Sequence, residues 1–77
     1  MHDAVVVRHF RVARRDMVFL KFIVEAYEGM MTMSTVDQRE GIVRISSADW
    51  AAADCAALLA SLQADITLEE MPDYVAH

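Results

Sequence analysis

The most continuous apolar pattern in the chain runs from Asp16 to Gly29 and reads DMVFLKFIVEAYEG. An aspartate can cap the first turn of a helix, and a glycine readily takes the left-handed conformation after the last turn, so these two residues mark a helix start and stop. Between them the charged side chains, Lys21, Glu25 and Glu28, fall within an arc of about 60° at 100° per residue. A surface helix normally has a wider polar face. We therefore expect this helix to be covered on two sides, by a sheet and by a further partner.

Four other segments have the β-branched and apolar composition of strands, residues 5–13, 30–36, 42–45 and 66–71. The polar run from Asp37 to Gly41 predicts a hairpin turn, with Asp37 accepting an Asx-type hydrogen bond.

A second helix is predicted to start at Ser46-Ser47-Ala48-Asp49 and to run to about Ala64. Its core-facing stripe recurs at spacings of four, three and four and consists of Ala51, Cys55, Leu58 and Leu62.

The order strand, helix, strand, strand, helix, strand predicts an α+β fold, the ferredoxin-like βαββαβ sandwich. In this fold a four-stranded antiparallel sheet carries both helices on one face. We expect a single domain over residues 1–77, with a core of about 5–71 and a tail at 72–77. The uncovered sheet face and the apolar first helix predict a homo-oligomer, with a dimer favoured. The candidate interface residues are Phe22, Tyr27, Met31 and Met33.

The composition narrows the classes of partner. Twelve acidic and seven basic residues give a net charge of −5, which would repel nucleic acid and anionic membranes. The apolar runs are interrupted by charges before the ~20 residues that span a bilayer, and no leader is evident. The single Cys55 cannot form an internal disulfide and fits a reducing compartment. We expect a soluble, cytoplasmic protein with no nucleic-acid or membrane partner.

Several segments resemble a small bacterial family of stand-alone proteins catalogued only as a domain of unknown function. The segments are FLKFIVEAYEG at 19–29, STVD at 34–37 and GIVR at 41–44, within a similarity over roughly residues 8–66. By its order of elements the chain also resembles ACT domains, which are regulatory modules that bind amino acids at subunit interfaces. That resemblance implies a ligand-sensing role. The first turn of this chain, Arg14-Arg15-Asp16, lacks the glycine that ACT domains often carry there.

The sequence contains few residues that are candidates for ligand binding or catalysis. Arg14, Arg15 and Asp16 form the candidate ligand site, because two guanidinium groups beside a helix N-terminus can hold a carboxylate or phosphate. The alternative is a solvated loop in which Arg15 pairs with Asp16 or with a neighbouring chain. Glu25 is expected in a solvent-facing stripe with Lys21, or at a subunit boundary opposite a cation or hydroxyl.

No catalytic set, metal site or cofactor site is predicted. The histidines, His2, His9 and His77, lack metal-ligand spacing, and no base is placed beside the hydroxyls of Ser34 and Thr35. The chain is therefore not expected to be an enzyme.

Two functions remain open. One is a ligand-sensing or regulatory ACT-like module that acts as a homo-oligomer and binds a small anion or an amino acid. The other is a protein–protein interaction adaptor with no small ligand.

Overall fold

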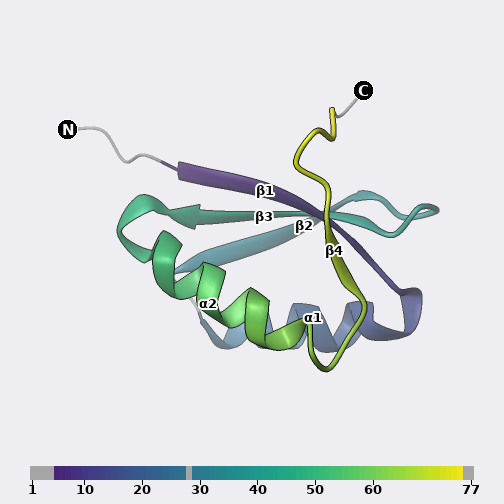
Figure 1. Ribbon diagram of the computed structural model, residues 1–77, viewed down its shortest axis with the longest axis horizontal. Helices are drawn as coiled ribbons and strands as arrows, with labels where there is room; N and C mark the ends of the chain where they lie inside the picture. Colours follow the sequence, from purple (N-terminus) through teal and green to yellow (C-terminus); the bar gives the residue numbers. More distant parts are fainter. Residues whose placement is uncertain (1–4, 28, 76–77) are drawn as a thin grey trace.

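The computed structural model describes residues 5–27 and 29–75 and has the predicted α+β, ferredoxin-like architecture (Figure 1). Glu28, a member of the expected charged stripe, lies outside the described residues, as do His2 and His77. The elements in chain order are β1 (Val5–Val12), α1 (Arg14–Ala26), β2 (Met31–Asp37), β3 (Ile42–Ala48), the 3-10 turn η1 (Asp49–Ala51), α2 (Ala52–Leu62) and β4 (Leu68–Glu70).

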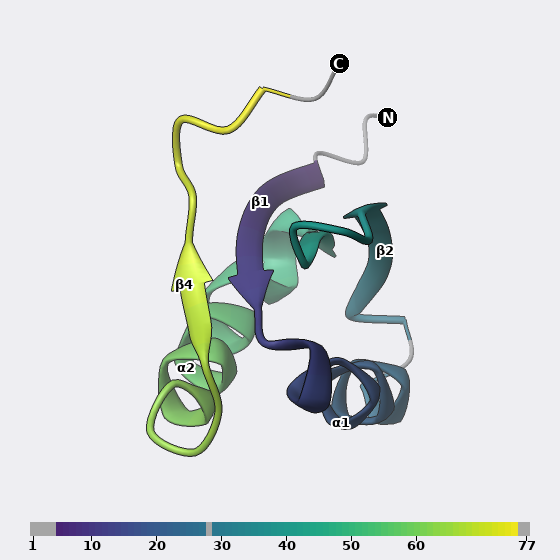
Figure 2. The ribbon, with the colours of Figure 1, turned by 90° about the vertical axis from the view of Figure 1, so that its right-hand side faces the viewer.

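The four strands form one sheet in the order β2-β3-β1-β4, and all neighbouring pairs are antiparallel. Both helices cover the same face of the sheet (Figures 1 and 2). Between sheet and helices lies one apolar core, in which Phe10 of β1, Leu20 of α1 and Val43 of β3 are completely buried. Phe10 and Val43 are paired across β1 and β3 and so point to the same side of the sheet.

Helix α1 begins three residues earlier than predicted, because only Ala13 separates it from β1. Ala13 is the N-cap, and no side chain caps this helix end. The prediction of Asp16 as the cap is therefore wrong. Asp16 lies in the first turn, and its Oδ2 accepts a hydrogen bond from the backbone N–H of Thr67 at 3.2 Å. The carboxylate thus joins α1 to the chain segment that leads into β4.

Strand β3 is longer than predicted, and the second helix starts later. Ser46 and Ser47 continue the strand, since each is paired with β1 on one side and with β2 on the other. A central strand must satisfy its backbone groups on both edges, and this requirement outweighs the capping tendency of serine.

The hairpin between β2 and β3 forms as predicted. Asp37 Oδ1 accepts a hydrogen bond from the N–H of Glu40 at 3.0 Å, so its carboxylate shapes the turn as expected, although the donor is three residues on and not two as in an Asx turn. Gly41 ends the turn with a φ of 73°, and Gly29, after α1, has a φ of 85°. Within the described residues, neither helix combines the length and apolarity needed to cross a membrane.

Candidate functional site

The outward side of α1 carries an apolar surface that no other part of the described chain covers. Val18 is 74% exposed, Phe22 is 72% exposed and Phe19 is 46% exposed. We call these three residues the α1 outer face. Leu20 and Val24 point to the opposite side of the helix and are buried against the sheet. The sequence predicted that α1 would be covered on two sides, and the structure shows one side buried and the other apolar and open.

Charged side chains lie at both ends of the α1 outer face. Arg14 and Arg15 are exposed in the first turn, and Glu25 is exposed near the last residue of the helix, Ala26. At 100° per residue, Arg15 falls in the middle of the apolar stripe and Glu25 falls at its margin. The first turn of this surface is therefore positive, and Glu25 places a carboxylate near its other end, one turn after the exposed Lys21.

The three residues of the predicted ligand site all lie in the first turn of α1, and their side chains have different surroundings. The carboxylate of Asp16 is directed to Thr67, whereas Arg14 and Arg15 are both exposed. In the described part of the chain neither arginine makes an ion pair within 4.0 Å, so the expected Arg15–Asp16 pair does not form. The two guanidinium groups are available to a partner.

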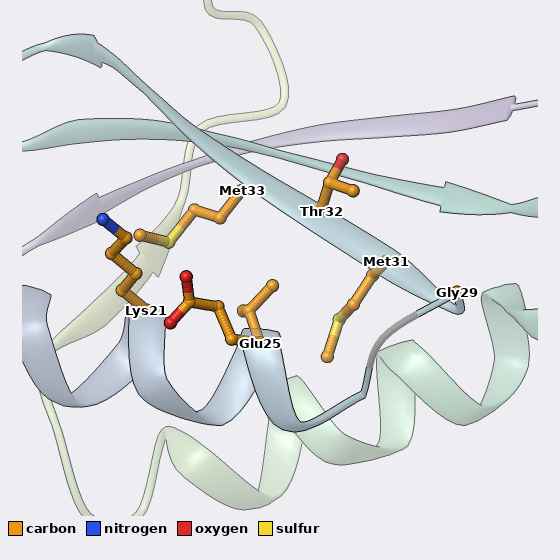
Figure 3. Close-up of a pocket in the computed structure, with 7 residues that line it drawn as sticks. Lys21, Glu25, Gly29, Met31, Thr32 and Met33 are labelled. Carbon is orange, nitrogen blue, oxygen red and sulfur yellow. The ribbon is translucent and has the colours of Figure 1, made fainter.

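A groove lies along the other flank of α1, between the helix and β2 (Figure 3). It has a volume of about 470 Å³. The helix contributes Lys21, Val24 and Glu25, and the edge strand contributes Met31 and Met33. In Figure 3 the side chains of Lys21 and Glu25 both rise from α1 toward β2. We call this feature the α1–β2 groove.

The four predicted interface residues separate into two groups. Phe22 and Tyr27, which is 39% exposed, lie on or next to α1 and are accessible. Met31 is 4% exposed and belongs to the core of its own chain, so its prediction as an interface residue conflicts with its burial. Met33 is half-buried beside it. Period-two alternation places Met31 on the inward face of β2, whereas the methionine-rich composition of this segment favours a contact surface.

The open face of the sheet carries a polar cluster that the sequence did not indicate. Arg44 Nε donates a hydrogen bond to His9 Nε2 at 3.2 Å. The ring of Tyr74, from the segment after β4, packs on His9 with a centroid distance of 5.1 Å. These residues are 35 and 65 positions from His9 in the chain. The pairing of β1 with β3 places Arg44 beside His9, and the segment after β4 brings Tyr74 to the same position.

An ion pair connects β1 with the edge strand β4. Arg8 donates two hydrogen bonds to Glu70, Nε to Oε2 at 2.9 Å and a terminal nitrogen to Oε1 at 2.6 Å. The hydrogen bond from Arg8 lowers the pKa of the Glu70 carboxyl and raises the pKa of Arg8, and partial burial opposes both shifts. In the part of the chain described, no three histidine, cysteine, aspartate or glutamate side chains are grouped as metal ligands.

Comparison with known proteins gives one match. The family described as "Domain of unknown function (DUF4911)" matches residues 10–66, which is more than half of the chain. The match contains the FLKFIVEAYEG and STVD segments, and it confirms the resemblance that these segments indicated. Neither the curated proteins nor the solved structures gave a match.

Proposed function

Because this chain belongs to the DUF4911 family, whose description names no activity, we propose from the geometry of α1 that it is a homodimeric interaction module. The two copies are joined by their α1 outer faces. The observation that carries this proposal is the exposure of Phe22 and Val18, at 72% and 74%, on the solvent side of a helix whose opposite side is buried against the sheet. Contiguous exposed apolar residues on a helix are typical of protein–protein contacts.

Burial of this surface would stabilise a dimer. Covering a side chain of the size of phenylalanine or valine contributes about 1.5–3 kcal/mol. In a two-fold dimer the same residue is buried in both copies, so each contribution counts two times. A chain of 77 residues gains from this contribution, because domains of its size bury only about 60% of their unfolded surface alone.

The distribution of charge favours a second copy, in antiparallel orientation, as the partner. Helix α1 spans residues 14–26, so residue 20 is its midpoint. A two-fold axis through that midpoint places residue 15 of one copy opposite residue 25 of the other, and residue 18 opposite residue 22. Arg15 then faces Glu25, and Val18 faces Phe22. The antiparallel arrangement also aligns the opposite ends of the two helix dipoles.

In this arrangement the role of Arg15 differs from its role in the predicted ligand site. Instead of holding a small anion, Arg15 neutralises a carboxylate of the second copy. Each such pair would be partly exposed and would contribute about 0.2–1 kcal/mol, so the apolar contacts supply most of the affinity and the charges fix the orientation.

The test is the molar mass in solution, measured by light scattering or sedimentation over a range of concentrations. We expect a dimer for the natural chain and a monomer for Phe22→Asp, because the substitution puts two carboxylates into the apolar contact. Trp50→Asp is the matched control, since Trp50 is 70% exposed and belongs to η1, a different element from α1. It should remain dimeric.

Charge reversal tests the orientation. Arg15→Glu and Glu25→Arg should each weaken the dimer, because each places like charges opposite one another at two symmetric positions. The double variant Arg15→Glu/Glu25→Arg should restore the original affinity. A natural chain that is monomeric at every concentration would refute the proposal, and a double variant no tighter than the single ones would refute the antiparallel register.

A further inference from the structure

We propose that the α1–β2 groove binds a small zwitterion with an apolar body, of the chemical class of a free α-amino acid with an aliphatic side chain. This inference goes beyond the dimer and uses a different flank of α1. It rests on three features of the groove: its size, its two opposite charges and its apolar floor (Figure 3).

The size of the groove suits a small molecule. Its volume of about 470 Å³ lies in the range of about 300–1,000 Å³ that is usual for ligand pockets. Its walls are regular elements, a helix and an edge strand, so its charged groups are held on a rigid frame.

The two charges are placed to receive both ends of a zwitterion. Lys21 and Glu25 are one helical turn apart, which brings their Cβ atoms to about 5–6 Å from each other. Both are described residues, and they make no ion pair with each other within 4.0 Å. Each therefore keeps its capacity to bind an ion of opposite charge.

The helix itself sets the direction of the ligand. The last turn of α1 has no basic residue, so the partial negative charge of the helix C-terminus is uncompensated there. The ligand ammonium is favoured at this end, beside Glu25, and the ligand carboxylate is favoured one turn earlier, beside Lys21. A purely anionic ligand would be repelled by the carboxylate of Glu25, and a purely cationic ligand would be repelled by the ammonium group of Lys21.

The floor of the groove is apolar and adaptable. Val24 and Met31 are buried and Met33 is half-buried, and all three line the groove. Thioether side chains are flexible and polarisable, so they can adjust to aliphatic groups of different shape. In Figure 3 the Met31 side chain points from β2 toward the helix, whereas Thr32 points to the other side of the strand.

Ligand binding and dimerisation do not exclude each other. Val18 and Phe22 do not line the groove. Glu25 belongs to both sites, but a carboxylate has about four acceptor positions and can bind an ammonium and a guanidinium together. The monomeric variant Phe22→Asp should consequently retain the groove.

L-Leucine is the probe for the first experiment, and two analogues each remove one charge. They are 4-methylpentanoate, which lacks the ammonium, and 3-methylbutylamine, which lacks the carboxylate. We expect calorimetry and amide chemical shifts of residues 29–33 to report leucine binding. Each analogue should bind at least about tenfold more weakly, the equivalent of one lost charge-assisted contact.

Two variants locate the site. Lys21→Met should reduce leucine affinity at least about tenfold, whereas Arg14→Met, which removes an exposed cation of α1 outside the groove, should leave it unchanged. Phe22→Asp should bind leucine as the natural chain does, so that failure of the dimer and failure of the ligand site are separate results. Absence of leucine binding, equal binding of the analogues, or full affinity in Lys21→Met would each overturn the proposal.

Discussion

Gly41 lies where the β2–β3 hairpin meets the end of β1. Its φ of 73° is in the left-handed region, and its carbonyl accepts a hydrogen bond from Val12 N–H at 2.8 Å. A Cβ atom added at this position would lie 2.5 Å from the carbonyl oxygen of Val12. The neighbour is backbone and is itself held in the sheet, so it cannot easily move away.

We therefore expect Gly41→Ala to destabilise the fold by about 2–4 kcal/mol, the sum of left-handed strain of about 1–2 kcal/mol and the steric conflict. Gly29→Ala is the matched control. Gly29 has a φ of 85°, but an added Cβ there meets nothing within 4 Å, so only the strain applies. Urea unfolding of both variants measures the difference. Equal losses of stability at the two sites would show that the contact with Val12 has no effect.

At the scale of elements, β4 is the shortest strand of the sheet, with three residues, and Arg8–Glu70 attaches it to β1. The Glu70 pKa is lowered in the folded chain, so the native state binds this proton less readily than the unfolded state. The ion pair therefore contributes its full stabilisation above the ordinary glutamate pKa of about 4.3. This stabilisation is lost as the pH falls through the lowered pKa of Glu70 in the native state.

Glu70→Gln should reduce the free energy of unfolding at neutral pH by about 0.5–1 kcal/mol, a modest value because both side chains are about one-third exposed. The difference from the natural chain should be constant above about pH 5 and should shrink below about pH 4. Unfolding in denaturant across this range measures it, with the exposed Glu69→Gln as control. A difference that persists unchanged at pH 3 would contradict the role of the ionised pair.

The elements also show how far the sequence could predict this structure. Apolar periodicity in the sequence predicts both helices, all four strands and, through their order, the topology, because burial of one face dominates each of these segments. The residues at which the two helices start are predicted less accurately. Asp16 and Ser46 have the side chains of N-caps, but their positions are fixed by tertiary pairing, with Thr67 and with the flanking strands respectively.

The candidate site was only partly predictable for the same reason. The apolar excess on α1 was visible in the sequence, and Phe22 is exposed as an interface residue must be. The sequence does not predict the α1–β2 groove, because the groove depends on the distance between α1 and β2 and on which methionine points inward. The sequence favours a solvent-facing pair of Lys21 and Glu25, with a subunit boundary as the alternative for Glu25, and both residues line the α1–β2 groove (Figure 3).

At the scale of the whole molecule, two helices cover one face of the sheet and leave the α1 outer face open. A domain of this size has a stability of only about 5–10 kcal/mol, so burial of Val18 and Phe22 in a dimer is a substantial addition. If the dimer is the native form, then unfolding also dissociates it. The melting temperature must then depend on protein concentration.

A tenfold rise in concentration favours the dimer by about 1.4 kcal/mol, or about 0.7 kcal/mol per chain, which corresponds to an increase of about 3–6 °C in the melting temperature. We expect this slope for the natural chain and for Trp50→Asp in calorimetric scans. Phe22→Asp should melt at one temperature at all concentrations, because its unfolding is a property of a single chain. A melting temperature of the natural chain that stays constant over a hundredfold range would show that the α1 outer face does not couple folding to assembly.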